Sequence, residues 1–480
     1  MNEYSAGIAE YRIKGGELAT KMTSSRTGAI PRPRWRLPVL GDLTTMNLIT
    51  PTQTTMALGR ELGPIFERKL LNMRFVFVYD SEIVAELSDE TRFAKKTLPF
   101  LRSIGEDGLF TAHNDEPNWR HAHDLLKPGF TQAAMRGYHQ TMLDTTAALV
   151  RRWDRSAGRA GVDVAGDMTK LTLETIGRTG FSFTFNAFER EEPHPFVTAM
   201  IESLAYAPLR SVFSVPIIGD LLLRHPDGKE KARRDYMFGV VDKVIAERRE
   251  ADQDQNGDLL ELMMRAVRQN DPNRLDERNM RYQMITFLVA GHETTSGALS
   301  FALYYLSQHP EVLARAQAEV DDAWGRTEVP SFEQAAKLRY VRRVLDEALR
   351  LWPTAPVYSR QARQDTVVGG KYPMAAGESM NILIPNLHRT PAWGPDVDRF
   401  DPDRFAPDRV RNRAPHIYKP FGTGERACIG RQFAIHESLI ALGSILQRYD
   451  ITADPGYRLC VAERLTFMPK DFRLSLRVRN

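Results

Sequence analysis

The sequence has only two cysteines in 480 residues, Cys428 and Cys460. So few cysteines exclude a disulfide scaffold and favour a reducing compartment, so we expect a cytoplasmic protein. No run of about 18 unbroken apolar residues occurs, so we expect no membrane span. Lysine and arginine alternate with aspartate and glutamate at a net charge of +4. No clustered basic face of the kind that nucleic-acid binding requires is visible, so we expect no nucleic-acid partner.

The sequence also lacks the features that usually divide a chain into domains. No Gly/Ser linker, charge block or low-complexity tract interrupts it, and no internal repeat is visible. Residues 1–30 predict a flexible N-terminal tail, and residues 31–480 predict a single domain. With 42% hydrophobic residues, a domain of this length can hide a cofactor from water.

The apolar residues of the sequence recur mostly at the three- and four-residue spacing of helices. Residues 276–307 are apolar on nearly every side, which predicts a helix of roughly 45 Å through the core. Residues 337–352 predict a second helix, stopped by Pro353, and residues 366–390 predict short strands and turns. The sequence therefore predicts a fold that is mainly α with a minor β portion.

The most informative motif is PFGTGERACIGRQFAIHE, residues 420–437. Its fixed positions are Phe421, Gly422, Gly424, Arg426, Cys428 and Gly430, and a helical pattern follows at once. Glycines let the backbone approach a sulfur closely, and the start of a helix stabilises a thiolate. The alternative, for an isolated cysteine, is a buried free thiol in a glycine turn. Cys460 has no such neighbours and is interpreted as a small packed residue.

These positions match the haem-binding signature Phe-x-x-Gly-x-Arg-x-Cys-x-Gly, and the sequence resembles the cytochrome P-450 family. The resemblance implies the cytochrome P-450 fold, with haem b between the long central helix and the cysteine loop. It implies that Cys428 ligates the iron as a thiolate, which favours O–O cleavage. It also implies that Arg426 pairs with a haem propionate, that Phe421 packs beside the sulfur and that Gly430 approaches the porphyrin face.

Two further segments resemble haem contacts of the family. Trp119 and His123, in DEPNWRHAHDLL, are four residues apart and share a helix face. The family offers Trp, and often Arg or His four residues on, to the propionates. A satisfied surface histidine is the alternative for His123. Arg360 falls where many members place a third arginine that binds a propionate.

A third set of residues resembles a structural network of the family. Glu347 and Arg350, in LDEALRLWP, match the Glu-x-x-Arg motif, for which a solvated ion pair is the alternative. FDPDRF, at residues 400–405, resembles the Pro-Glu-Arg-Phe element, with Asp403 in place of Glu. The resemblance implies that Arg404 joins this pair in a buried network, which we interpret as specifying structure.

The middle of the long helix carries AGHETTS, which matches the family's Ala-Gly-x-Glu/Asp-Thr-Thr motif. The match implies a monooxygenase that uses dioxygen and two electrons. Thr294 is expected to hold dioxygen and its water by hydrogen bonds, and Glu293 is expected to feed protons as a general acid. Gly291 would leave room above the iron and let the helix open locally. The alternative is a polar kink in a buried helix.

Within the family, the sequence most resembles the haem domain of bacterial self-sufficient fatty-acid hydroxylases. This resemblance implies subterminal hydroxylation of medium- or long-chain fatty acids. It places Phe110 over the haem and Arg74 at the channel mouth, where it suits a substrate carboxylate. Pocket-lining residues near the iron would be Ala290, Ala355, Pro356 and Val357. Two features depart from that group: Val78 replaces a carboxylate-binding tyrosine, and residues 206–224, a substrate entrance in the family, are more apolar.

The sequence ends without flavin or nicotinamide motifs, so we expect either separate electron donors or a haem domain cut from a fusion. The electrons would come from NAD(P)H through a reductase and a ferredoxin or flavodoxin-type donor. Lys127, Arg136 and Arg431 are candidates to meet an acidic donor, and a solvated basic surface is the alternative. We expect a monomer.

Two other functions are compatible with the sequence. One is a hydroxylase or epoxidase that tailors a polyketide or terpenoid. The other is a non-catalytic haem sensor. The pair Glu293 and Thr294 argues against the sensor, because a sensor needs no proton relay.

Overall fold

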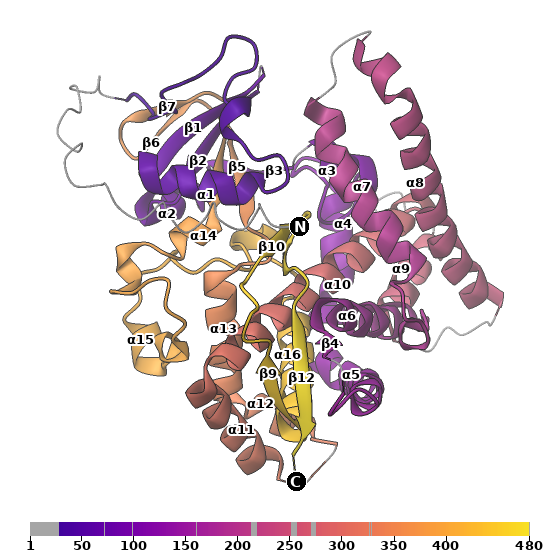
Figure 1. The fold of residues 1–480 in the computed structure, drawn as a ribbon. Helices are drawn as coiled ribbons and strands as arrows, with labels where there is room; N and C mark the ends of the chain where they lie inside the picture. The colour runs from indigo at the N-terminus through magenta and orange to yellow at the C-terminus, as the bar shows by residue number, and fades with distance from the viewer. Residues whose placement is uncertain are drawn as a thin grey trace.

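The structure, a computed structural model, describes residues 28–479 apart from residues 72, 98, 160, 213–217, 251–256, 270–274, 326 and 328. The predicted tail, residues 1–30, lies almost entirely outside the described residues. The larger sheet occupies the upper left of Figure 1, and below and to the right of it lie most of the helices together with the smaller sheet that contains β9 (Tyr449–Ala453) and β12 (Arg473–Val478). The predicted fold class, mainly α with a minor β portion, is confirmed.

The described helices are α1 (Pro51–Leu62), α2 (Ser81–Leu87), α3 (Pro99–Gly105), α4 (Pro117–Leu126), α5 (Gln132–Asp154), α6 (Val164–Phe181), α7 (Pro195–Val212), α8 (Ile218–Glu250), α9 (Leu259–Arg268), α10 (Glu277–Gln308), α11 (Pro310–Trp324), α12 (Phe332–Ala336), α13 (Arg339–Leu351), α14 (Ile384–Leu387), α15 (Pro407–Arg411) and α16 (Arg431–Arg448). The described strands are β1 (Ile65–Leu70), β2 (Met73–Val78), β3 (Phe93–Lys96), β4 (Val162–Asp163), β5 (Val357–Ala362), β6 (Thr366–Val368), β7 (Tyr372–Met374), β8 (Ser379–Leu383), β9 (Tyr449–Ala453), β10 (Val461–Glu463), β11 (Phe467–Pro469) and β12 (Arg473–Val478).

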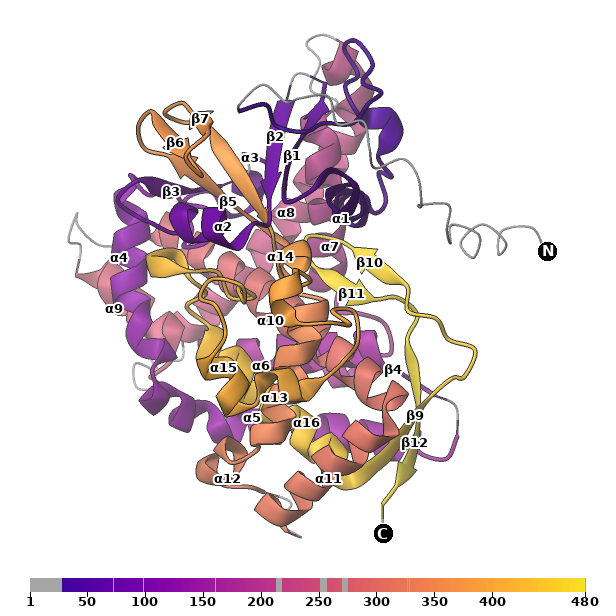
Figure 2. The same ribbon diagram turned by 90° about the vertical axis from the view of Figure 1, so that its left-hand side faces the viewer.

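The central helix is α10, which crosses the middle of the helical region (Figure 2). It begins after Asp276, whose side chain accepts a hydrogen bond from the N–H of Asn279. It packs against α6, α13 and α16, so nearly every side of it is covered. This burial explains the apolar pattern that predicted a core helix at residues 276–307, and the observed bounds differ from that range by one residue.

The larger sheet has the strand order β1-β2-β8-β5-β3, and all its pairs are antiparallel except β2 with β8. The pairing of β3 with β5 sets Lys95 opposite Arg360. The predicted strands and turns at residues 366–390 are β6, β7 and β8, but residues Ile384–Leu387 form the short helix α14. A second sheet has the order β4-β12-β9.

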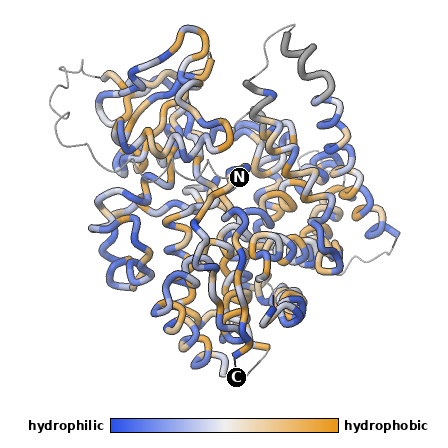
Figure 3. The backbone as a smooth tube through the Cα atoms, in the orientation of Figure 1, coloured by the Kyte–Doolittle hydropathy of each residue, from blue (hydrophilic) through white to orange (hydrophobic). Residues whose placement is uncertain are grey.

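Hydrophilic and hydrophobic stretches alternate along the outer helices in Figure 3. This alternation is typical of helices that bury one face and expose the other to solvent. Within the described residues, no helix combines the length and the apolar character that a bilayer crossing requires.

Candidate functional site

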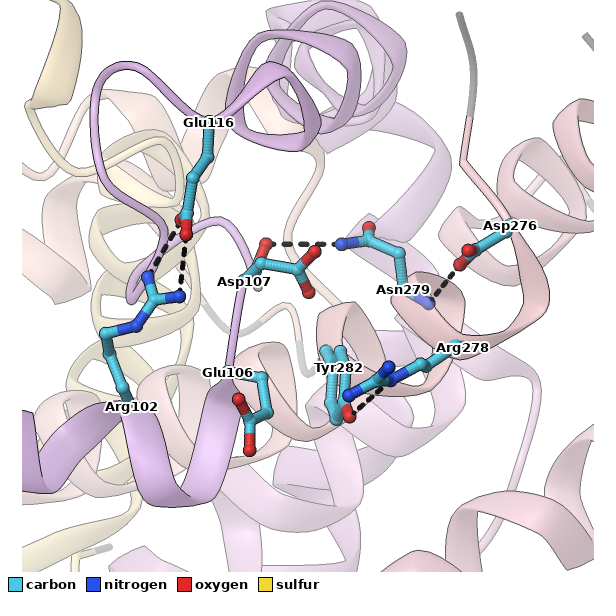
Figure 4. Close-up of a pocket in the computed structure, with 8 residues that line it drawn as sticks. All are labelled: Arg102, Glu106, Asp107, Glu116, Asp276, Arg278, Asn279 and Tyr282. Atoms are coloured by element: carbon cyan, nitrogen blue, oxygen red, sulfur yellow. Dashed lines mark hydrogen bonds and ion pairs between the residues drawn. The ribbon is translucent and has the colours of Figure 1, made fainter. Parts of the chain in front are cut away.

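The structure describes two cavities that differ in chemistry. The first has about 260 Å³ and lies between the segment after α3 and the start of α10 (Figure 4). Its charged groups bind one another: Arg102 donates to Glu116 at 2.8 and 2.7 Å, and Arg278 donates to the Tyr282 hydroxyl at 2.9 Å. None of the site residues predicted from the sequence lines it.

The second cavity has about 340 Å³ and lies beside α10, the start of α16 and strands β3 and β5. Most of its lining is apolar. The predicted residues that line it are Phe110, Trp119, His123, Ala290, Gly291, Thr294, Ala355, Val357, Arg360, Phe421, Arg426, Cys428 and Gly430. Because these residues come from distant parts of the chain and meet at one place, we treat this cavity as the candidate site.

The cysteine loop supplies one wall of the cavity. Gly422 and Gly424 have φ values of 71° and 70°, which residues with a side chain rarely adopt. The loop closes through a 2.9 Å hydrogen bond from the N–H of Cys428 to the carbonyl of Phe421. At Gly430, where α16 begins, an added Cβ would lie 4.0 Å from the sulfur. The backbone therefore approaches the thiol closely, as the motif predicted.

The Cys428 thiol is enclosed by protein and is accessible only because it faces the cavity. Burial raises its pKa above the usual 9.0, although the Gly430 N–H and the charges of Arg431 and Lys95 act in the opposite direction. Without a further positive charge the group is a neutral thiol at pH 7. A bound metal ion would supply that charge and convert it to a thiolate.

Cationic side chains gather at another part of the same cavity. Arg360 is only 2% exposed, and its Nη2 donates to the Thr423 carbonyl at 3.2 Å. Its Nε and Nη1 are buried without a hydrogen-bond partner among the described residues. Arg426 donates to Asn114 at 3.0 Å and lies over the Trp119 ring at 4.6 Å. Burial lowers the pKa of Arg426 to about 10.

Lys95 belongs to this cation cluster, and the sequence analysis did not identify it. Its ammonium lies 4.0 Å from the centre of the Phe110 ring and donates to the Phe110 carbonyl. Burial, then the charges of Arg426 and Arg360, lower its pKa well below 10.5. No local sequence signal marks this lysine, because only the pairing of β3 with β5 brings it beside Arg360.

The donor set fits haem b. The Cys428 thiol suits a metal, the apolar wall suits a porphyrin ring, and the basic side chains of Lys95, Arg360 and Arg426 suit two propionates. His123 also lines the cavity; it stacks on Trp119 with ring centres 5.3 Å apart, and its Nδ1 lies 3.0 Å from Asp124.

The polar residues Glu293 and Thr294 of α10 lie in different surroundings. Thr294 lines the cavity, and its hydroxyl donates to the Ala290 carbonyl at 2.8 Å. Glu293 does not line the cavity; it is 2% exposed, and both carboxyl oxygens lack a hydrogen-bond partner among the described residues. Burial raises its pKa to about 7. The predicted proton delivery therefore requires the Glu293 side chain to rotate.

Gly291 has a packing role in the structure. An added Cβ would lie 3.2 Å from Cγ1 of Ile176, so the glycine lets α6 approach α10 closely. Gly291 also lines the cavity, and the expectation that it leaves room above the iron stays a prediction. The expected local opening is not seen, because α10 is continuous through this position.

Two predicted substrate residues lie outside the cavity lining. Arg74, on β2, donates to Glu67 at 2.7 Å, and Glu67 also accepts from Arg36 at 2.7 Å. The Arg74 side chain is about half exposed, so it lies at the surface, and its place at the channel mouth stays a prediction. Pro356 is buried beside the lining residues Ala355 and Val357. The expected apolar entrance, residues 206–224, lies largely outside the described side chains.

The predicted network is present as a fully buried ion pair. Arg350 donates to both oxygens of Glu347 at 2.7 Å, and neither side chain is exposed. Arg350 also donates to the carbonyls of His388 and Val397 at 2.9 and 2.7 Å. Nε of Arg404 lies 3.6 Å from Glu347. The three residues therefore tie α13 to the segment that precedes the cysteine loop.

The remaining predicted residues lie at the surface. Arg136 pairs with Glu333, and Arg431 lies 5.5 Å from the Phe421 ring centre. Lys127 begins a short helix directly after α4. The expectation that Cys460 packs as a small buried residue is wrong, because Cys460 is exposed beside the β10–β11 hairpin.

Comparisons with known proteins agree on one family. The family model "Cytochrome P450" matches residues 31–474. The bifunctional cytochrome P450/NADPH–P450 reductase of Bacillus cereus is 43% identical over 459 residues, which cover 94% of this chain and 42% of that protein. Bifunctional cytochrome P450/NADPH–P450 reductase 1 of Bacillus subtilis is 43% identical over 462 residues, covering 95% and 43%. A bifunctional cytochrome P450/NADPH–P450 reductase of Acremonium egyptiacum is 37% identical over 469 residues, covering 95% and 44%. The chain thus spans about two fifths of the length of these relatives.

Proposed function

The chain belongs to the cytochrome P450 family, and from this premise we propose that it is a haem-thiolate monooxygenase that inserts one atom of dioxygen into a substrate C–H bond. The observation that carries the proposal is the cavity that the Cys428 sulfur faces, whose lining also includes Arg360 and Arg426. Haem would supply the oxygen and one-electron chemistry that the side chains lack.

Each residue of the chain has a distinct task in this proposal. Cys428 ligates the iron and donates electron density to it. Lys95, Arg360 and Arg426, with Trp119 and His123, bind the propionates. Thr294 holds a proton at its hydroxyl within the cavity, and Glu293 supplies protons to that hydroxyl after its side chain rotates. Phe110 and the other apolar side chains exclude bulk water.

The proposed substrate is a medium- or long-chain fatty acid, hydroxylated near its terminus. The apolar lining beside Thr294 supports an alkyl chain. The engagement of Arg74 by Glu67 argues against a carboxylate anchor at that residue. The same observation favours a second candidate, an uncharged polyketide or terpenoid, which needs no such anchor.

We further propose the setting in which the protein works. The relatives are named as fusions with an NADPH–P450 reductase, which supports electrons from NAD(P)H through a flavodoxin- or ferredoxin-type donor. The donor would dock near Lys127, Arg136 and Arg431. Residues 31–480 would form a single monomeric domain in the cytoplasm, after a tail at residues 1–30.

The decisive experiment is the carbon monoxide difference spectrum of the reduced protein. Thiolate ligation predicts the strongly red-shifted Soret band that is typical of the family. Cys428→Ser should abolish this band, whereas the matched control Cys460→Ser should keep it, because Cys460 lies outside the cavity. A protein that stays colourless after haem supplementation contradicts the proposal.

Two further measurements separate the candidate functions. Titration with fatty acids of increasing chain length should shift the haem from low to high spin, and no shift at any length favours the second substrate class. Oxygen-dependent product with a surrogate reductase distinguishes a monooxygenase from a haem sensor, which would turn over no substrate.

A further inference from the structure

We propose that Glu90 is a positioning residue that holds the cysteine loop and Arg360 in place, and that its negative charge lowers the reduction potential of the haem. The inference rests on the proposed function, because it requires that the chain binds haem through Cys428. Glu90 lies in the turn between α2 and β3, far from the cysteine in sequence.

The first contact joins Glu90 to the cysteine loop. The N–H of Glu425, three residues before Cys428, donates to both carboxylate oxygens of Glu90 at 2.9 and 3.1 Å. The neighbouring Gly424 has a φ of 70°, and a Cβ at this position would collide with the Glu90 carboxylate. The Glu90 carboxylate therefore packs directly against the loop, and the positive φ of Gly424 favours glycine there.

The second contact joins Glu90 to the cation cluster. Nη2 of Arg360 lies 3.8 Å from Oε1 of Glu90, with side-chain exposures of 3% and 31%. The same nitrogen donates to the Thr423 carbonyl. Nε and Nη1 of Arg360 remain without a partner among the described residues. Glu90 and the loop thus hold one edge of the guanidinium.

The backbone around Glu90 is itself anchored. Arg363 donates from its Nε to the Glu90 carbonyl at 2.9 Å, and from its backbone N–H to the Arg92 carbonyl at 2.9 Å. The carboxylate is therefore a fixed negative charge beside a buried, incompletely neutralised cation. A fixed negative charge near a metal stabilises the more positive oxidation state, so it lowers the reduction potential.

The test replaces Glu90 by glutamine. Glu90→Gln keeps a side-chain oxygen that can accept from the Glu425 N–H but removes the charge. The reduction potential, measured by spectroelectrochemical titration, should become more positive than that of the parent protein, with the thiolate carbon monoxide band unchanged. Glu86→Gln is the matched control: Glu86, on α2, pairs with Arg92 at 2.7 Å and accepts from the Gly369 N–H, so its partners differ from the cysteine loop and Arg360 that Glu90 contacts. It should leave the potential unchanged.

A double-mutant cycle tests the route through Arg360. The shift caused by Glu90→Gln should shrink when Arg360→Gln is already present, and equal shifts in both backgrounds contradict that route. An unchanged potential in Glu90→Gln overturns the inference while haem binding still supports the proposed function. If the parent protein binds no haem, the proposed function itself fails, and the inference fails with it.

Discussion

Two interior carboxyl groups, Glu293 in α10 and Glu437 in α16, have no hydrogen-bond partner among the described residues. Burial raises the pKa of Glu293 to about 7 and that of Glu437 to about 8. Protonation removes most of the cost of burying such a group. The two groups differ in their neighbours, because Glu293 adjoins Thr294, which carries a hydroxyl proton in the cavity, within the motif expected to deliver protons, and they therefore lead to different predictions.

Glu293→Gln should lower product formation by roughly 100-fold, because an amide carries no transferable proton. In the parent protein the proton on Glu293 is lost as the pH rises through about 7, so product formed per electron should fall over the same range. The variant should lack this pH dependence. The measurement is product against electrons consumed, on both sides of pH 7, with a surrogate reductase. Parallel profiles for the two proteins would exclude a proton-delivery role.

Glu437→Gln should change stability rather than chemistry. The folded state raises the pKa of Glu437 above its ordinary value of 4.5. The stabilisation from its protonation is therefore complete below pH 4.5 and is lost as the pH rises towards 8. At alkaline pH the free energy of unfolding of the variant should exceed that of the parent by about 1–3 kcal/mol. At acidic pH the two values should be nearly equal. Urea unfolding at two pH values checks this, and a gain that is independent of pH would contradict it.

At the scale of elements, a histidine pair joins α5 to α16. A carbonyl can only accept, so Nε2 of His139 donates to the Pro330 carbonyl at 2.8 Å. When both rings are neutral, Nδ1 of His139 accepts from Nε2 of His436 at 3.0 Å. The pair connects α5 to α16, the helix that begins at the cysteine loop.

His436→Gln should flatten the acid limb of the stability profile. Burial, then the neighbouring His139, lower the pKa of His436 to about 4. The stabilisation of the neutral pair is therefore present above pH 6.5 and is lost as the pH falls towards 4. Between these pH limits the free energy of unfolding of the parent should fall by roughly 2 kcal/mol. The variant should not show this fall, because glutamine keeps a hydrogen-bond donor but does not titrate. Denaturant titrations at neutral and mildly acidic pH measure the difference, and equal losses would refute it.

At the scale of the whole molecule, the buried network of Glu347, Arg350 and Arg404 connects the helical region with the long segment before the cysteine loop. Burial raises the pKa of Glu347, opposed mainly by Arg350. The pair gains its geometry from two hydrogen bonds of 2.7 Å and from backbone carbonyls on the far segment. We interpret the network as specifying how the two parts of the molecule dock.

Arg350→Lys should destabilise the fold by about 3–5 kcal/mol, because lysine cannot bind both Glu347 oxygens and the carbonyls at once. The matched control is Arg342→Lys on the same helix, where Arg342 pairs with Asp346 at 2.8 Å and is 28% exposed. Arg342→Lys should lower the free energy of unfolding by less than about 1 kcal/mol. Thermal and denaturant unfolding compare the two, and similar losses would show that the buried pair has no special role.

Features whose physics is local could be predicted from the amino-acid sequence. The periodicity of residues 276–307 predicted α10, because a helix covered on all sides is apolar on all sides. The two glycines and Cys428 predicted the tight loop, because their backbone geometry and the following helix lie within a few residues.

Only the tertiary structure decided which distant groups face one another. The register of β3 against β5 brought Lys95 beside Arg360, and the turn before β3 placed Glu90 against the cysteine loop. The pairing of β1 with β2 set Arg74 beside Glu67 instead of the cavity. Shifting a strand by one residue reverses the face of every side chain, and β3 and β5 are too far apart in the sequence for a connecting turn to fix their register. The cavity and its charges are therefore products of strand pairing and helix packing.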